Sequence, residues 1–350
     1  MPAGVFKETY LGVMAIARYP IHWAFGIIGS VLLVLLPFIL PTYHIAFIVH
    51  LTIFFIGAVG LNLLSGLAGQ ISLTHAALMG LGAYMATYLA LWGVHMIPAI
   101  YIAGLVAATI SFFLGLPSFR LKGYYLAMAS IAMQIVLEYV FSLINPHQYM
   151  NVPSEPKYLR IGGYEVYLGD GTPLYYFVVL VALIMGLFAV NLARSSVGRA
   201  FKAVRDNDVS AEIIGINVAH TKALAFTIAG FYAGVAGGLY ALANPSINWE
   251  GFMLDTSIEY FAMILVGGLG RIIWGSLLGV VMIRGGWLSF EALLTDVLMG
   301  LGPEWAFLAS AAKYLVLGSL VSIFLLAEPG GLIEVLRRIK EYLRLWPYSY

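Results

Sequence analysis

Long apolar stretches recur along almost the whole chain, and they constrain its fold more than any other feature. A helix needs roughly 20 mostly apolar residues to cross a hydrocarbon core about 30 Å thick. Of the 350 residues, 61% are hydrophobic and only 10% are charged, whereas a soluble domain carries about 25% charged residues. The chain is therefore predicted to be an all-α integral membrane protein without a separate soluble domain.

About ten stretches are predicted to span the membrane. They run approximately over residues 21–40, 44–64, 73–92, 97–116, 124–144, 174–192, 223–242, 257–270, 272–285 and 306–327. The eighth and ninth are short, and only Arg271 in a glycine-rich turn divides them, so they form a tight hairpin or a broken pair. This polytopic domain, 21–327, lies between an N-terminal segment, 1–20, and a C-terminal helix or tail, 328–350.

The distribution of Lys and Arg predicts the orientation. Ten crossings place both termini on one side, and cytoplasmic termini put fourteen of the 18 Lys and Arg residues inside. Lys157, Arg160 and the borderline Arg284 then lie outside. Because cytoplasmic loops carry an excess of Lys and Arg, we expect a multi-pass protein of the bacterial inner membrane with a cytoplasmic loop at 194–222 and an external loop at 145–173.

Composition also excludes several classes of function. The net charge of +1 provides no basic field for nucleic acid, and cysteine is absent, which rules out disulfides, thiol nucleophiles and thiolate metal sites. The histidines show no metal-like spacing, so no metal and no cofactor are expected. Membrane lipid is an expected partner, and the first twenty residues show no cleavable signal peptide.

The longest basic cytoplasmic loop, residues 194–222, reads RSSVGRAFKAVRDNDVSAEIIGINVAHTK. Its centre is predicted to be a short helix outside the bilayer. Asp208 is a suitable N-cap, Glu212 suits the first turn, and Gly215 is a suitable stop.

The order of residues in three segments resembles the branched-chain amino acid permeases of the ABC importer class. Residues 197–237 (VGRAFKAVRDNDVSAEIIGINVAHTKALAFTIAGFYAGVAG) resemble the cytoplasmic loop and following span of that family. Residues 60–84 (GLNLLSGLAGQISLTHAALMGLGAY) resemble its characteristic early segment, and residues 257–279 (SIEYFAMILVGGLGRIIWGSLLG) its glycine-rich penultimate region. The similarity runs from about residue 47 to about residue 326.

The resemblance implies a transmembrane subunit of an ATP-binding cassette importer. Such a subunit pairs with a homologous permease or a second copy, binds two ATPase subunits and receives solute from a periplasmic binding protein. A P-loop contains Gly-Lys, a dipeptide that this chain lacks, so the chain is not expected to be an enzyme. The residues implied to form and brace the coupling helix, which docks on the ATPase, are Arg199, Asp206, Ala211, Glu212, Gly215, Ile216 and Asn217.

Residues 66–75 are too rich in glycine and polar side chains for a lipid-facing helix. Non-helical backbone at membrane depth is tolerated only where protein buries it or where it faces a cavity. We therefore place along the translocation pathway Gly69, Gln70, Ser72, Thr74, His75 and Tyr84, whose polar side chains could bond a passing solute weakly. The alternative is that Gln70 and His75 bond freed backbone groups and hold the break in shape.

Three ionisable residues are predicted within spans, toward the external side: Glu138, Glu259 and Lys313. Charges at such depth are costly and are normally paired or face water. We predict that Lys313 pairs with Glu259 or Glu138 and braces an outer gate, and the alternative is a proton relay.

Two rival classes remain. An ion-coupled secondary transporter would also suit the buried Glu138 and the broken helix near Gly69, and it would need no ATPase. A membrane enzyme is the third class, although neither HExxH nor GxSxG is present. The solute stays open, because the 145–173 loop lacks the Thr-Gly-Gly-type turn usual in amino-acid-transporting members. A branched-chain amino acid, a related amino acid, an amide or an organic acid all remain candidates.

Overall fold

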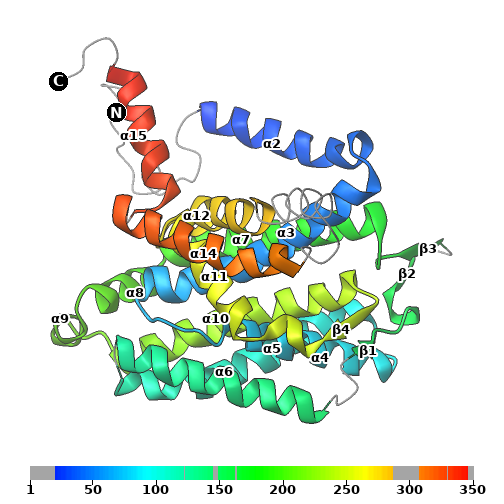
Figure 1. The fold of residues 1–350 in the computed structure, drawn as a ribbon, viewed down its shortest axis with the longest axis horizontal. Coiled ribbons are helices and arrows are strands. Elements are labelled where there is room, and N and C mark those ends of the chain that lie inside the picture. Colours follow the sequence, from blue (N-terminus) through cyan, green and yellow to red (C-terminus); the bar gives the residue numbers. More distant parts are fainter. Residues whose placement is uncertain are drawn as a thin grey trace.

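The structure, a computed structural model, describes residues 20–121, 123–144, 149–161, 164–286, 307–328 and 330–345. This part of the chain consists of helices and two small two-stranded sheets (Figure 1). Most of the long helices run side by side and form one bundle.

Five helices are long and apolar enough to cross a membrane. They are α3 with its π-helical continuation η1 (Thr42–Leu67), α5 with the 3-10 turn η2 (Met96–Phe119), α6 (Tyr124–Ile144), α7 (Gly171–Arg194) and α10 (Val218–Ala243). Three further predicted spans match α2 (Pro20–Ile39), α4 (His75–Leu91) and α14 (Phe307–Ala327). The helical membrane fold is confirmed. By length and composition alone, five helices of the described residues could cross a membrane, or six if a bent pair counts as one span, and the count of ten stays a prediction.

The eighth and ninth predicted spans form a sharply bent pair. α11 (Leu254–Gly267) has 14 residues, and α12 (Ile272–Val280) has 9 and continues into the π-helical turn η5 (Val281–Gly285). At 1.5 Å per residue, α11 is about 21 Å long, too short for a core of about 30 Å. The pair is bent by 119°, and Gly268 and Gly270 at the turn have φ of 128° and 79°, where glycine is favoured.

α10 lies at the centre of the bundle and packs against α3, α4 and α5. Glycines allow these close approaches. A Cβ atom on Gly237 would overlap the Met79 carbonyl oxygen, and one on Gly82 would overlap the backbone of Gly234. Small residues give such packing where lipid supplies no hydrophobic drive between helices.

The two ends of the bundle differ (Figure 1). One end carries β1 (Tyr149–Asn151) paired with β4 (Ser246–Asn248), and β2 (Tyr158–Ile161) paired with β3 (Tyr164–Tyr167), with the 3-10 turns η3 (Glu155–Lys157) and η4 (Trp249–Phe252) beside them. The other end carries α8 (Ser196–Asp206) and α9 (Asp208–Ile213). These are the predicted external and cytoplasmic ends, respectively. The sequence predicts none of the strands, since β1 and β4 are three residues long and far apart in the chain.

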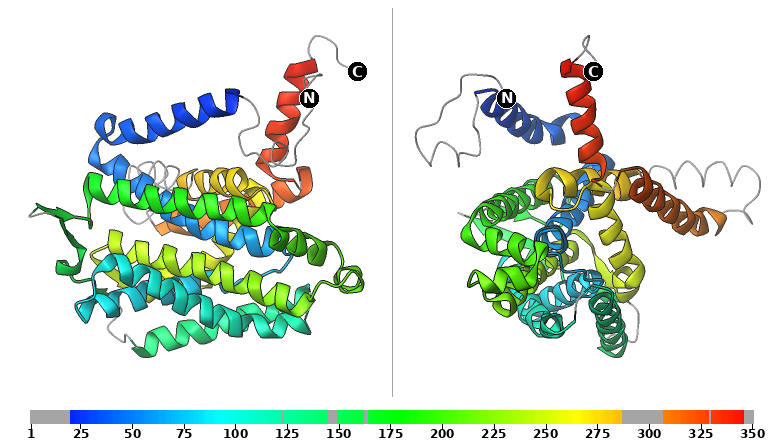
Figure 2. Two further views of the ribbon diagram at one scale, coloured as in Figure 1. Left: turned by 180° about the vertical axis from the view of Figure 1, so that it is seen from behind. Right: turned by 90° about the vertical axis from the view of Figure 1, so that its left-hand side faces the viewer.

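α2 and α15 (Leu332–Leu345) lie at the periphery of the bundle. The hydroxyl groups of Tyr175 and Tyr176 on α7 donate to the carbonyl oxygens of Leu33 and Val34 on α2, at 2.9 and 2.8 Å. Figure 2 shows α15 lying across the direction of the bundle helices, and Figure 1 places it at the end that carries α8 and α9. The predicted C-terminal segment thus contains a helix, and nearly all of segment 1–20 lies outside the described residues.

Candidate functional site: coupling loop and intramembrane break

The predicted cytoplasmic loop, residues 194–222, contains two helices, α8 and α9, each capped by a local side chain. The Ser195 hydroxyl accepts from the Gly198 N–H at 3.5 Å, at the start of α8. The Asn207 side-chain oxygen accepts from the N–H groups of Val209 and Ser210, at 2.9 and 3.1 Å, at the start of α9. The predicted short helix is therefore present, but the prediction that Asp208 caps it is wrong, because Asn207 holds that position.

α9 ends where the sequence predicts. Gly215 has φ of 87°, a conformation that L side chains rarely adopt, and its N–H donates to the Glu212 carbonyl at 2.9 Å. The Asn217 side chain then accepts from the His220 N–H at 2.9 Å and caps α10. A tight turn thus separates the short helix from the central helix of the bundle.

The predicted coupling residues differ in burial. Ala211 is buried, whereas Glu212, Gly215 and Asn217 are exposed and Ile216 is half-buried. Of the two predicted bracing residues, Arg199 donates to the Arg194 carbonyl at 3.3 Å, and Asp206 lies 3.8 Å from the Arg205 guanidinium in an exposed contact. Both act within α8 and its junction with α7, and neither of these contacts involves α9.

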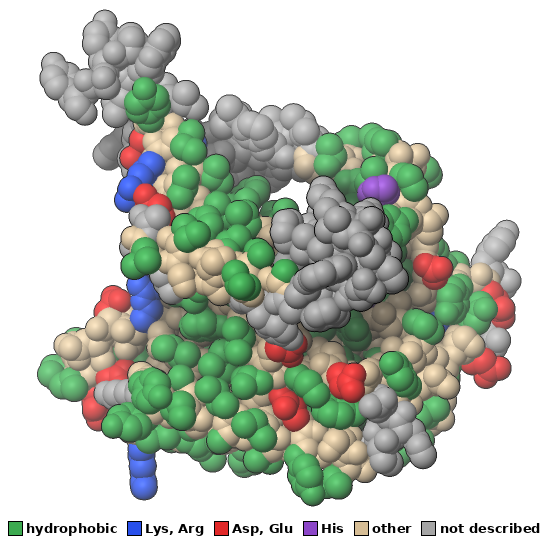
Figure 3. Space-filling view, in the orientation of Figure 1, with side chains coloured by type: hydrophobic (Ala, Val, Ile, Leu, Met, Phe, Trp, Pro, Cys, Tyr) green, Lys and Arg blue, Asp and Glu red, His purple; other side chains and the backbone are tan. Residues whose placement is uncertain are grey.

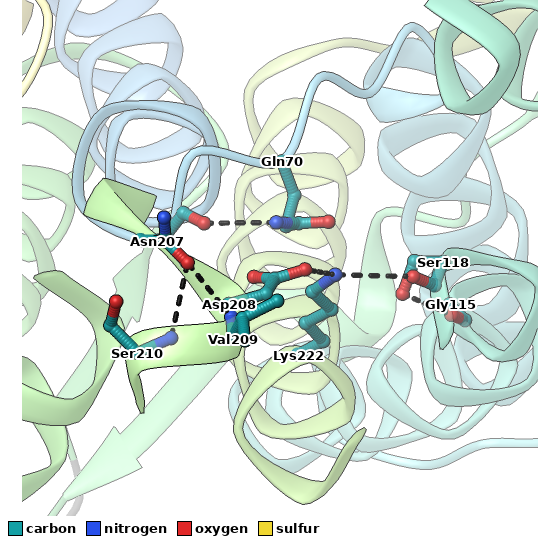
Figure 4. A network of polar contacts seen from close by, with 9 residues as sticks. Gln70, Gly115, Ser118, Asn207, Asp208, Val209, Ser210 and Lys222 are labelled. Carbon is teal, nitrogen blue, oxygen red and sulfur yellow. Dashed lines mark hydrogen bonds and ion pairs between the residues drawn. The ribbon is translucent and has the colours of Figure 1, made fainter. Parts of the chain in front are cut away.

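Lys222 holds α9 in place, a role that sequence reasoning missed. Its ammonium lies 2.8 Å from a carboxylate oxygen of Asp208, and the two side chains are 1% and 13% exposed. The same ammonium donates to the Ser118 carbonyl in η2 at 3.4 Å. Figure 4 shows these residues meeting beside Gln70, so the start of α9, the start of α10 and the end of the fourth predicted span are joined by one buried cation.

The intramembrane break begins in η1 (Asn62–Leu67) and leaves residues 68–74 non-helical. Arg205 of α8 reaches it, because its guanidinium donates to the Gly66 carbonyl at 2.6 Å. Gly69 has φ of 67°, and a Cβ there would lie 2.6 Å from the Arg205 side chain. The coupling loop and the break are therefore in direct contact.

A cavity of about 420 Å³ lies between the break and the coupling loop. Its lining includes Gln70 from the break, Asn207 and Asp208 from the start of α9, and Lys222 from α10. Gln70 donates to the Ala68 carbonyl at 3.0 Å, so its side chain supports the turn that it belongs to.

Polar residues of the break are buried and mostly bond protein groups. His75 contacts the Gly57 carbonyl at 2.8 Å, Thr74 donates to the Ser130 carbonyl at 2.9 Å, and Ser72 contacts the Thr74 N–H at 3.5 Å. Tyr84 is buried and stacks on Phe141, with ring centroids 5.3 Å apart. Gln70 and His75 both contact backbone carbonyl groups, and their role along the pathway stays a prediction.

Gln134 closes the other side of the break. Its side-chain oxygen accepts from the Ala77 N–H and from the Ser257 hydroxyl, both at 3.1 Å. Its amide nitrogen donates to Glu138 at 2.9 Å and to the Phe252 carbonyl at 2.8 Å. One buried glutamine thus links α4, α6 and α11 around the start of α4.

Residues 43–325 match the protein family described as branched-chain amino acid transport system / permease component. The chain belongs to this family. It is therefore a permease component of a branched-chain amino acid ABC transport system, a multi-pass membrane protein and not an enzyme. Membership in this family argues against the two rival classes named from the sequence, an ion-coupled secondary transporter and a membrane enzyme.

Individual relatives of this permease are distant. It is 26% identical over 310 residues to the high-affinity branched-chain amino acid transport system permease protein LivM of Escherichia coli, covering 81% of this chain and 68% of the relative. It is 26% identical over 302 residues to BraD of Pseudomonas aeruginosa (79% and 90%) and 24% identical over 247 residues to a probable LivM of Methanocaldococcus jannaschii (68% of each). No solved structure matches the permease.

Glu259, which the sequence places within a span, has a partner that the sequence does not predict. Both carboxylate oxygens of Glu259 accept from Arg284 at 2.9 and 3.0 Å, and the guanidinium lies 4.3 Å from the Phe54 ring centroid. Glu138 accepts from Gln134, as described above. Lys313 belongs to α14, but its side chain lies outside the described residues, so its predicted pairing stays a prediction.

Metal binding finds no support in the described part of the permease. No group of three or more His, Asp or Glu side chains there lies close enough to hold an ion. The polar groups of the break and the coupling loop instead bond the protein itself.

Proposed function

We propose that this permease imports a small polar solute, with energy from two ATPase subunits that dock on α9. The supporting observation is the apolar tip of α9. Val209, Ile213 and Ile214 are 63%, 80% and 72% exposed at the end of the bundle, while Asp208 anchors the helix to buried Lys222. Scattered exposed apolar residues need no explanation, but three on one short, anchored helix and its C-cap suit a groove in a partner protein.

Charge supports a cytoplasmic location for this tip. The helices on both sides of it end in the loop at 194–222, which carries five of the basic residues assigned to the inside: Arg194, Arg199, Lys202, Arg205 and Lys222. Figure 3 shows Lys and Arg side chains gathered at the end of the bundle that carries α8, α9 and α15.

The solute is an aliphatic or related amino acid, or a chemically similar small amide or organic acid. The relatives named for branched-chain amino acid transport support this class. A periplasmic binding protein delivers the solute to the external end, where the segments around β1 to β4 form the surface. A second permease, homologous or identical, completes the pathway, and the break from Gly69 to His75 together with Tyr84 lines or shapes it.

Reconstitution tests the proposal. The permease would be placed in proteoliposomes with the ATPase subunits, permease partner and binding protein encoded beside it. We expect accumulation of labelled leucine or valine that requires both internal ATP and the binding protein. Accumulation driven by an ion gradient without ATPase subunits would refute the proposal, and a screen of amides and aromatic acids against the binding protein would correct the solute alone.

A further inference from the structure

A groove on the surface of the bundle lies between α7 and α12. Its volume is about 730 Å³, within the range of roughly 300–1,000 Å³ typical of small-molecule pockets. Leu183 and Leu187 of α7 and Trp274 of α12 form its rim and are 50%, 55% and 66% exposed. Gly186 leaves room in its wall, since a Cβ there would meet only the Ile273 side chain, at 3.5 Å.

Three cations surround the cytoplasmic end of this groove. Arg194 comes from the end of α7, Lys202 from α8 and Arg271 from the turn before α12. None of the described residues that line the groove is acidic. A ligand that fits must therefore combine an anionic head with an apolar tail that follows the helices.

We propose that this groove binds an anionic phospholipid of the inner leaflet, with its phosphate at Arg194, Lys202 and Arg271 and an acyl chain along Leu183, Leu187 and Trp274. Basic pockets between transmembrane helices on the cytoplasmic side suit phospholipid head groups. The exposed Trp274 fits the same depth, because tryptophan is enriched at the membrane interface. Occupation would clamp the turn at Arg271, which lies next to the break, against α8 of the coupling loop.

Fluorescence quenching at Trp274 tests the site directly. The purified full chain in neutral detergent would be titrated with phosphatidylglycerol carrying brominated acyl chains, and separately with phosphatidylcholine carrying the same chains. Subtracting the signal of a Trp274→Phe variant isolates this residue from the other tryptophans. We expect saturation at clearly lower concentrations of phosphatidylglycerol than of phosphatidylcholine.

Substitutions distinguish binding of the lipid head group from binding of its acyl chain. Each cation removed should weaken phosphatidylglycerol binding about fivefold, so Lys202→Gln with Arg271→Gln should weaken it about 25-fold and leave phosphatidylcholine unchanged. Gly186→Leu fills the groove and should reduce quenching by both lipids, whereas Gly186→Ala should not. Arg120→Gln with Lys340→Gln removes the same charge from exposed positions outside the groove and should have no effect on binding.

Three results would overturn the inference. They are equal quenching by both lipids, a Lys202→Gln/Arg271→Gln variant that behaves as its matched control, and efficient disulfide formation between two copies of a Leu187→Cys variant, which would make the groove a protein interface. The natural absence of cysteine makes that last experiment clean. Because no ATPase or transport is involved, a negative result leaves the proposed function untouched.

Discussion

The Lys222–Asp208 pair provides the sharpest test of how α9, the proposed coupling helix, is held. Asp208→Asn keeps the side-chain shape but removes the charge that balances a side chain only 1% exposed. Breaking a buried ion pair on one side costs about 3–5 kcal/mol, because an uncompensated charge remains. Since Asp208 keeps 13% exposure, we expect a loss of about 3 kcal/mol, or about 150-fold in the unfolding equilibrium constant.

Denaturant unfolding of the purified permease, followed by tryptophan fluorescence, measures this loss. The double variant Asp208→Asn/Lys222→Met should recover most of it, since neither charge is then buried without its partner. Glu341→Gln is a matched control: it breaks a 3.7 Å pair with Arg337 whose side chains are 55% and 62% exposed, and such pairs contribute about 0–1 kcal/mol.

The same variants report on coupling. With α9 released from Lys222, ATP hydrolysis by the reconstituted complex should persist while ATP-driven uptake falls, and membrane insertion should remain normal. The reasoning is refuted if Asp208→Asn destabilises the permease no more than Glu341→Gln, or if the double variant is the less stable of the two Asp208 variants.

Three further outcomes are expected. Gly215→Pro forces φ away from 87°, and Glu212→Arg reverses an exposed charge beside Ile213. Both variants should lower solute uptake per ATP hydrolysed without reducing membrane insertion. Unchanged uptake would contradict the docking role. Glu259→Gln leaves Arg284, 27% exposed, without its carboxylate, and should cost about 2 kcal/mol in denaturant unfolding, less than a fully buried pair; a double variant with Arg284→Met should be more stable than Glu259→Gln. Burial lowers the pKa of Lys157 from 10.5 to about 8, so between these pH values the unfolded chain binds more protons than the native permease does. The free energy of unfolding, relative to that of Lys157→Met, should therefore rise from pH 7.5 to pH 9.5. A difference between the two proteins that does not change with pH would exclude this titration.

The helices are the part of the fold that sequence predicts well. A run of about 20 apolar residues has few alternatives to a membrane helix, and the break at Gly69 and the turn at Gly268 follow from glycine and polar residues at membrane depth. Gly215 likewise marks the end of α9, because a positive φ is a local property of one residue. Each of these predictions depends on neighbouring residues only.

The missed features depend on contacts between distant residues. Asn207 and Asp208 are both good helix caps. Asn207 caps α9 because the Asp208 carboxylate is bound to the buried ammonium of Lys222. Arg284 reaches Glu259 only because the 119° bend folds α12 and η5 back along α11. Neither the burial of a lysine nor the angle of a bend can be predicted from the residues next to it in the sequence.

One cation joins the proposed coupling loop to the break, and a second holds the loop against the bundle. Lys222 fixes the start of α9 to α10 and η2, and Arg205, at the end of α8, bonds the Gly66 carbonyl inside the break. Asn207 alone separates α8 from α9, so a displacement of α9 changes the position of Arg205 or strains its 2.6 Å bond. Asn62 of η1 connects the break to the bent pair, because its side chain accepts from the Gly270 N–H at 2.8 Å and donates to the Ser276 hydroxyl at 3.1 Å. With α9 docked as proposed, its movement would reach the break through Arg205 and the bent pair through Asn62.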